Sequence, residues 1–206
     1  TYLFINSLVI KGTDIFAGTR GGGIFLSTNN GNSWSEVNNG LTISNIWVLA
    51  TRGSNIFAGT DRGVFLSTNN GNSWKEVNNG NMGQNVISLA ISGTNIFAGT
   101  FMGVFLSTND GDSWEAVSTG LPQYSRVNAL KINGSNIFAG TDEDGMFLST
   151  NNGSNWTEVN TGLPENSSIR SIAISDTNIF ASTDHGIFLS SNNGSSWAEV
   201  NTGLTN

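Results

Sequence analysis

The chain has 206 residues, 37% of them apolar, with no cysteine, one histidine and a formal net charge of −7. It is an acidic chain long enough to bury a core, and its composition excludes disulfide scaffolds, thiol nucleophiles and zinc sites made of Cys or several His residues. Five Arg and three Lys residues do not supply the clustered cations that track nucleic-acid phosphates, so we do not expect nucleic acid as a partner.

Membrane insertion is not expected either. No apolar run approaches the roughly 20 residues that span a bilayer. The sequence begins at Thr1 without the basic and apolar pattern of a signal peptide. Such a start is typical of a mature, truncated or excised chain.

The chain is a repeat from start to end. Five Trp residues recur at spacings of 40, 40, 42 and 41 residues: Trp34, Trp74, Trp114, Trp156 and Trp197. A period of this length is typical of four-stranded propeller blades. The predicted blades cover about residues 1–40, 41–80, 81–120, 121–162 and 163–206, which together make one domain.

Each unit runs through the same series of elements. An apolar strand is followed by a turn, an Asn-Ile-Phe-Ala-Gly-Thr-like strand, a Gly turn, a Phe-Leu-Ser strand, an Asn-Gly turn and a last strand near the Trp. In the second unit the strands are predicted at Ile46–Thr51, Asn55–Thr60, Val64–Thr68 and Ser73–Val77. A β-helix repeats at about half this length or less, and helical repeats need a 3.6-residue pattern that is missing here. We therefore predict an all-β fold, a five-bladed β-propeller with four antiparallel strands per blade and about 41 residues per blade.

The turn between the third and fourth strands carries the motif Ser-x-Asn-x-Gly-x-x-Trp, which we call the box. Its Asn can accept backbone N–H groups, its Gly can adopt positive φ, and its Trp is expected to cover the hairpin. The predicted structural residues are Ser27, Asn29, Gly31, Trp34, Ser67, Asn69, Gly71, Trp74, Ser107, Asn109, Gly111, Trp114, Ser149, Asn151, Gly153, Trp156, Ser190, Asn192, Gly194 and Trp197.

This motif resembles the Asp-box, or bacterial neuraminidase repeat, of sialidases, xyloglucanase-type glycosidases, sortilin-type receptors and photosystem assembly factors. The usual Asp at the third position is Asn in all five copies, which keeps the acceptor and removes the charge. The resemblance implies that the boxes are structural and lie away from any active site. The units are also similar to repeats of secreted bacterial surface proteins, which implies an extracellular or cell-surface location.

Loop lengths point to one end of the blades as the functional end. In a four-stranded meander, the loops between the second and third strands lie at the same end as the loops that join blades, and we call this the variable end. The boxes lie at the other end, the box end. Length changes fall at residues 20–23, 142–145, 121–126 and 163–168, all at the variable end. Insertions in repeat proteins often collect on the binding face.

Candidate binding residues are those that differ between units at the variable end. Trp47 is interpreted either as packing between blades or as a sugar platform, and Arg170 either as a carboxylate or hydroxyl ligand or as a partner of a nearby Asp. Phe101 and Met102 offer an apolar contact. The Asp142–Gly145 loop is read as a solvated acidic turn, with calcium binding as the weaker reading. The full set is Trp47, Phe101, Met102, Tyr124, Arg126, Asp142, Asp144, Arg170 and His185.

An enzyme is not expected, and no cofactor or metal is predicted. Sialidase chemistry, as the resemblance implies it, needs an Arg triad and a Tyr–Glu pair, and neither is found among five Arg and two Tyr residues. A glycosidase needs two suitably spaced carboxylates, and short loops at the variable end predict only a shallow site. Glu36, Glu76, Glu158 and Glu199 are expected to blunt the outer strand edges with charge.

The sequence therefore favours a non-enzymatic scaffold or protein-interaction module. A lectin-like carbohydrate-binding module that uses the variable end is the alternative, and an Asp-box glycosidase is the third reading. The expected partner is a protein or a glycan. A monomer is the expected state, with self-association as the alternative, and the similarity of the units indicates recent duplication or design. Asn30-Gly31 and Asn79-Gly80 are expected chemical weak points.

Overall fold

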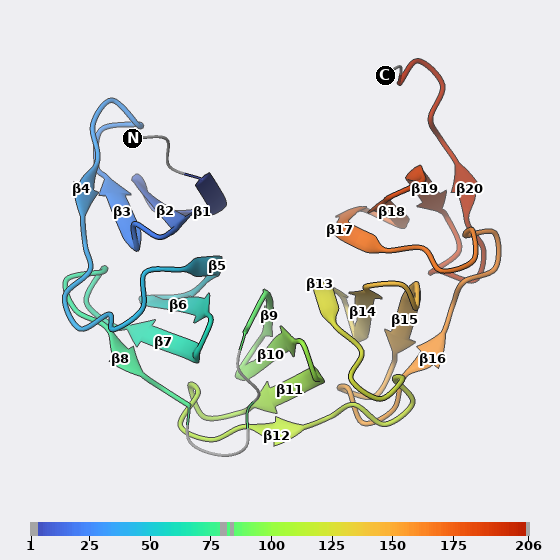
Figure 1. The fold of residues 1–206 in the computed structure, drawn as a ribbon, viewed down its shortest axis with the longest axis horizontal. Coiled ribbons are helices and arrows are strands. Elements are labelled where there is room, and N and C mark those ends of the chain that lie inside the picture. The colour runs from blue at the N-terminus through green and yellow to red at the C-terminus, as the bar shows by residue number, and fades with distance from the viewer. Residues whose placement is uncertain (1–3, 79–81, 83–84, 205–206) are drawn as a thin grey trace. The chain divides into compact units, whose positions relative to one another are not determined.

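A computed structural model describes residues 4–78, 82 and 85–204. Asn79-Gly80 lies outside the described residues. The described chain forms five sheets of four antiparallel strands each, in which neighbours in sequence are neighbours in the sheet (Figure 1). We call these sheets blades 1 to 5. No helix in the described part of the chain is long and apolar enough to cross a membrane.

Blades 1 to 3 are built from the following strands. Blade 1 contains β1 (Phe4–Lys11), β2 (Asp14–Arg20), β3 (Ile24–Ser27) and β4 (Ser35–Glu36). Blade 2 contains β5 (Ile46–Arg52), β6 (Asn55–Thr60), β7 (Gly63–Ser67) and β8 (Lys75–Glu76). Blade 3 contains β9 (Ser88–Ser92), β10 (Asn95–Thr100), β11 (Gly103–Ser107) and β12 (Glu115–Ala116).

Blades 4 and 5 repeat this pattern. Blade 4 contains β13 (Val127–Asn133), β14 (Asn136–Thr141), β15 (Met146–Ser149) and β16 (Thr157–Glu158). Blade 5 contains β17 (Ile169–Ser175), β18 (Asn178–Thr183), β19 (Gly186–Ser190) and β20 (Ala198–Glu199). The prediction of an all-β chain with four antiparallel strands in each of five blades is confirmed.

The fourth strands are shorter than predicted. In blade 2 the strand covers Lys75–Glu76 rather than Ser73–Val77. The reason is that Ser73 and Trp74 bond elsewhere: the Ser73 N–H donates to Asn69 Oδ1 at 2.9 Å, inside the box, and the Trp74 N–H donates to the Asn39 carbonyl of blade 1 at 2.9 Å. Lys75 and Glu76 pair with β7 as a strand, and beyond them the Val77 N–H adds one bond to the Val64 carbonyl of β7 at 2.9 Å.

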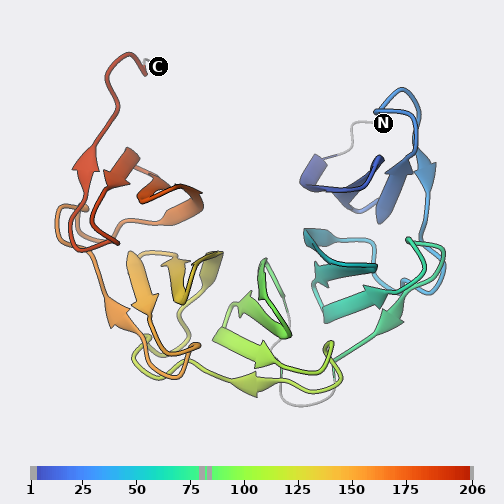
Figure 2. The ribbon, with the colours of Figure 1, turned by 180° about the vertical axis from the view of Figure 1, so that it is seen from behind.

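The chain divides into two compact units. The first comprises residues 1–100 and 105–116, and the second comprises residues 101–104 and 117–206. In the first unit β1 and β2 pack on β5, and β5 packs on β9. In the second unit β13 and β14 pack on β17, and Figure 2 shows these sheets from behind.

Apolar residues from adjacent blades form the cores. In the first unit, Phe16 and Ile24 of blade 1 are buried with Leu49, Phe65 and Trp74 of blade 2. In the second unit, Phe138 and Met146 of blade 4 are buried in the same way with residues of blade 5, which include Ile172, Phe188 and Trp197. Blade 2 packs against blade 1 on one face and against blade 3 on the other, so its second strand β6 is apolar without strict alternation.

The box turn has the geometry that its residues predict. In blade 2 the buried Ser67 hydroxyl accepts the Gly71 N–H at 2.9 Å and donates to Asn69 Oδ1 at 3.0 Å. Asn70 and Gly71 both have positive φ, 60° and 81°, as the two central residues of a type I′ turn require. The Gly–Ser bond recurs at 2.9 Å in the other four boxes.

The box Trp has a wider role than the expected cover of its own hairpin. The Trp74 Nε1–H donates to the Val37 carbonyl of the preceding blade at 2.7 Å, and Trp114 bonds Val77 at 2.8 Å. In the second unit Trp156 and Trp197 bond Val117 and Val159 in the same way. In blades 2 to 5 the Trp therefore bonds to the preceding blade, a long-range contact that the local motif does not reveal.

Candidate functional site

The two ends of the blades are assembled as predicted. At the variable end, Asp61, which follows β6, accepts hydrogen bonds from Asn45 Nδ2 and Trp47 Nε1, both at 2.6 Å. At the box end, Lys11 Nζ donates to Asn70 Oδ1 of the next blade at 2.8 Å. The loops between second and third strands therefore lie with the loops that join blades, and the boxes lie with the remaining turns.

A bulge near the start of the first strand carries a unit-specific side chain in blades 1, 2, 4 and 5. The register of β5 with β6 shifts between Ile46 and Val48, so Trp47 is the extra residue, and shifts at the same place skip Asn6, Asn128 and Arg170. A bulge re-aims the side chain of the extra residue. The variable position of the sequence is thus a bulge position, which directs its side chain toward the loops of the variable end.

In the second unit, several predicted residues converge on Asp142, which follows β14. The nearest Arg126 and Arg170 guanidinium nitrogens lie 3.8 and 3.7 Å from its carboxylate. The Ser168 hydroxyl donates to Asp142 Oδ1 at 2.9 Å, and Asn128 Nδ2 lies 3.5 Å from the same oxygen. We call these five residues the Asp142 cluster. The reading of Asp142 as a solvated turn residue is wrong, because it binds side chains of two blades.

An apolar surface adjoins the cluster. The Arg126 guanidinium lies 4.5 Å from the centroid of the Phe101 ring, a cation–π contact. Phe101, Met102 and Tyr124 are 37%, 52% and 67% exposed. Tyr124 has a positive φ of 61° in the turn where the Ser125 N–H donates to the Pro122 carbonyl. These exposed side chains and the two Arg residues all belong to the second unit.

Asp184 and His185 continue the site along blade 5. Asp184 Oδ1 accepts the Ser168 N–H at 3.0 Å and lies 3.1 Å from His185 Nδ1. Desolvation raises the pKa of the Asp184 carboxyl, but hydrogen bonds from the Ser168 and Asp184 N–H groups and the nearby His185 outweigh it, so the pKa lies below the ordinary value of 3.8. Ser168 therefore links Asp142 to Asp184 through its hydroxyl and its amide.

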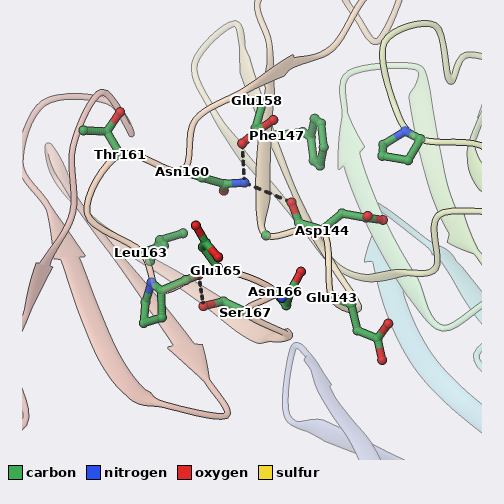
Figure 3. Close-up of a pocket in the computed structure, with 13 residues that line it drawn as sticks. Glu143, Asp144, Phe147, Glu158, Asn160, Thr161, Leu163, Glu165, Asn166 and Ser167 are labelled. Carbon is green, nitrogen blue, oxygen red and sulfur yellow. Dashed lines mark hydrogen bonds between the residues drawn. The ribbon is translucent and has the colours of Figure 1, made fainter.

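A polar pocket of about 550 Å³ lies beside the cluster in the second unit (Figure 3). Glu143, Asp144, Glu158 and Glu165 contribute four carboxylates to its lining. The Asp144 side chain accepts the Ser125 hydroxyl at 2.8 Å. The remaining lining is Pro122, Gly145, Phe147, Asn160, Thr161, Leu163, Pro164, Asn166 and Ser167.

Asn160 shapes the wall of this pocket, and the sequence analysis missed it. Its Oδ1 accepts the Met146 N–H at 2.7 Å, while its Nδ2 donates to the Asp144 carbonyl at 3.0 Å and to Glu158 Oε1 at 2.9 Å. Glu158, predicted only to blunt an edge, thus orients this amide. The signal was present in the sequence, because four units carry Asn two residues after this Glu or its equivalent.

The pocket has an equivalent in blade 1. A cavity of about 380 Å³ is lined by Gly21, Gly22, Gly23, Glu36, Asn38, Leu41, Thr42, Ile43 and Ser44. Asn38 and Glu36 correspond to Asn160 and Glu158, but three Gly residues stand where blade 4 has its acidic loop. The Glu and Asn of the repeat therefore form the pocket in both blades, and the loop between the second and third strands determines its charge.

Trp47 belongs to the first unit, whereas the Asp142 cluster belongs to the second. Its indole N–H is taken by Asp61, and the Arg20 guanidinium lies 5.9 Å from the ring centroid. Among the described residues, no group of three or more His, Asp and Glu side chains could hold a metal ion. Asp142 itself is surrounded by Arg, Ser and Asn donors rather than by further oxygen ligands.

Comparison with solved structures identifies the architecture as a β-propeller. An ancestral GH74 enzyme matches with a TM-score of 0.81 at 22% identity, over 98% of this chain and 32% of the enzyme. The extracellular domain of a one-component system from B. thetaiotaomicron matches with a TM-score of 0.76 at 19% identity, over 91% of this chain and 27% of that one.

A third structure, YCF48 bound to D1 peptide, matches with a TM-score of 0.74 at 14% identity, over 97% of this chain and 67% of that one. The chain thus spans a third or less of the first two proteins. No protein-family model and no curated protein matches the chain. The similarity establishes the fold and leaves the function to the site.

Proposed function

We propose that this chain is a non-enzymatic interaction module that binds a protein partner at the variable end of its second unit. The observation that carries the proposal is the Asp142 cluster beside exposed Phe101, Met102 and Tyr124. Arg and aromatic residues are enriched at protein interfaces and at their energetic centres. A loop end that gathers them on rigid sheets is suited to recognition.

The charges of the cluster indicate which chemistry the partner presents. Two guanidinium groups share one carboxylate at distances of 3.8 and 3.7 Å, longer than a hydrogen bond. The Arg126 and Arg170 side chains are 44% and 58% exposed, so their N–H groups are accessible to a second carboxylate. The partner segment would therefore place an Asp, a Glu or a terminal carboxylate next to an apolar side chain that contacts Phe101.

The similar structures support a recognition role. YCF48 was solved with a bound peptide, so a propeller of this kind can bind a peptide. The units resemble repeats of secreted bacterial surface proteins, and one matching structure is an extracellular domain. We propose an extracellular or cell-surface location on these grounds.

A carbohydrate-binding role is the second candidate, and the polar pockets of blades 1 and 4 favour it. Both combine a Glu and an Asn from the repeat with backbone groups of the adjoining loops, and such groups can bind sugar hydroxyls. The pockets differ in charge, however, whereas a repeat lectin would be expected to keep its sites alike.

We propose that the chain has no glycosidase activity, because two acids of the variable end already bind protein groups. Asp61 binds Asn45 and Trp47, and Asp144 binds Ser125. Engaged carboxylates are poorly placed for the acid and nucleophile roles of glycoside hydrolysis. Release of reducing sugar from xyloglucan by the purified chain would contradict this.

A peptide array tests the interaction proposal. Peptides that place Asp, Glu or the C-terminal carboxylate next to Phe or Leu are expected to bind, and Arg126→Ala or Phe101→Ala should weaken binding at least about tenfold. Lys131→Ala removes an exposed cation of the same blade and should leave binding unchanged. Equal binding by all variants, at unchanged melting temperature, would reject this surface, and binding confined to a glycan array would favour the second candidate.

A further inference from the structure

Adjacent blades meet through two complementary faces. The Trp face of a blade carries the box Trp, and the Gly face of the preceding blade carries the Val carbonyl that accepts the indole N–H. The same Gly face supplies a second acceptor, because the Trp74, Trp156 and Trp197 N–H groups donate to the Asn39, Thr119 and Thr161 carbonyls at 2.9, 2.8 and 2.8 Å.

A Gly follows each of these acceptors and receives the Trp backbone. Gly40, Gly120 and Gly162 have φ of 85°, 94° and 92°, and a Cβ at any of them would collide with the carbonyl oxygen of the Trp in the next blade. The position therefore needs Gly both for its conformation and for the close approach. We call the space beside this Gly, which the backbone of the next Trp occupies, the cradle.

No other blade in the described part of the first unit covers the Trp face of blade 1. Trp34 is 41% exposed, whereas the other four box Trp residues are 2–7% exposed. A cavity of about 410 Å³ on this face is lined by Ile5, Leu8, Ala17, Phe25 and Trp34. These residues correspond one for one to Ile46, Leu49, Ala58, Phe65 and Trp74, which blade 2 buries against blade 1.

The Gly face of blade 5 carries the complementary groups. Gly203 has a φ of 86°, and a Cβ there would meet nothing within 4 Å, so its cradle is open. Val200 and Leu204 beside it are 39% and 61% exposed. Ser171 is also exposed. It corresponds to Ser7 of blade 1, whose hydroxyl accepts the Leu49 N–H of blade 2 at 2.9 Å.

We propose that the Trp face of blade 1 binds the Gly face of blade 5 of a second copy of this chain. A second copy is the occupant whose matching surface this structure itself describes. Trp34 would donate to the Val200 carbonyl, its backbone would enter the Gly203 cradle, and the Leu8 N–H would meet Ser171. At the box end of this contact, Asn30 would face Ser175 and Asn178, which are uncharged. The contact is head-to-tail, so each copy offers one Trp face and one Gly face.

Molar mass as a function of concentration tests this proposal, which does not depend on the proposed function. Light scattering should show species of at least twice 21.8 kDa as the concentration rises, with a blue shift of Trp34 emission. Leu8→Lys, at an exposed position of the Trp face, and Gly203→Asn, which closes the cradle, should each raise the concentration for half-association at least about tenfold.

A control and a mixing experiment make the test specific. Gly21→Asn changes a Gly of similar φ, 91°, that also has open space and should leave association unchanged. When the Leu8→Lys chain is mixed with the Gly203→Asn chain, the Gly face of the first and the Trp face of the second are both unchanged. The two variants should therefore form a heterodimer. A wild-type chain that stays at 21.8 kDa at every concentration, or association that neither variant weakens, would overturn the proposal.

Discussion

The first serine of each box is a small side chain with a large structural role. Its hydroxyl accepts the N–H of the box Gly in place of a backbone carbonyl. These serines are at most 1% exposed: Ser27, Ser67, Ser107, Ser149 and Ser190. A buried N–H without an acceptor costs free energy. The boxes are therefore sensitive to a change of one atom.

Ser67→Ala tests this role. It removes the acceptor of the buried Gly71 N–H, so the free energy of unfolding should fall by about 1–3 kcal/mol, measured by urea denaturation. Ser54→Ala removes a hydroxyl in an exposed turn whose one bond, to Asn55, is 3.4 Å long, and should change stability by less than about 0.5 kcal/mol. Equal effects would show that the box hydroxyl is dispensable.

Acidification should weaken the Asp184 link. The pKa of Asp184 is lower in the folded chain than its ordinary value of 3.8, so the ionised carboxylate stabilises the fold above the unfolded pKa, and this contribution is lost as pH falls through the folded pKa. The difference in urea midpoint between the wild type and Asp184→Asn should therefore shrink between pH 6 and acid pH. A difference that grows in acid would contradict the lowered pKa.

At the scale of elements, the fourth strand and the following Asn hold the variable end in place. The two-residue strand β16 is too short to define a loop by itself. Asn160 adds contacts to the start of β15 and to the Asp144 carbonyl, and thereby sets one wall of the pocket. In blade 3 a serine has this place, and the Val104 N–H donates to Ser118 Oγ at 2.9 Å.

This natural difference supplies a matched pair of variants. Asn160→Ala should lower the free energy of unfolding by about 1–3 kcal/mol, because the Met146 N–H loses its acceptor, and should speed amide exchange at Met146. Asn160→Ser keeps a hydroxyl acceptor and should retain most of the stability. If both variants behave alike, the amide does not position the loop.

At the scale of the whole molecule, stability comes from contacts between neighbouring blades. Repeat proteins of this kind are approximately sums of repeat and interface terms. The box Trp is a main interface residue, since it combines a buried ring with a hydrogen bond to the preceding blade. Among the described box Trp residues, Trp34 of blade 1 alone is exposed, at 41%.

The two environments of the box Trp predict unequal effects of the same substitution. Trp74→Ala should cost about 3–5 kcal/mol, as for other buried aromatic residues, whereas Trp34→Ala should cost clearly less when measured at concentrations where the chain is monomeric. Denaturant unfolding of both variants provides the comparison. Similar losses would mean that Trp34 is covered in the monomer.

Local patterns determined the blades. The Asn-Gly turns and the Phe-Leu-Ser segments act within one hairpin, and the Trp spacing marks the period of the repeat, so the five units, their four strands and the two ends could be predicted from the sequence. The site could be predicted in part: residues that depart from the repeat, such as Arg126 and Arg170, were identified because they interrupt a nearly copied background.

Only the tertiary structure decided how these residues combine. The pairing of Asp142 with two Arg residues, the role of Ser168 and the bonds from the box Trp residues of blades 2 to 5 to the previous blade join residues that are 16 to 39 positions apart. Hydrogen bonds and ion pairs depend on distances of a few ångströms, and such distances between separate elements follow from packing rather than from local sequence. The sequence by itself determined the repeat and its turns, and packing between blades decided the site and which faces remain open.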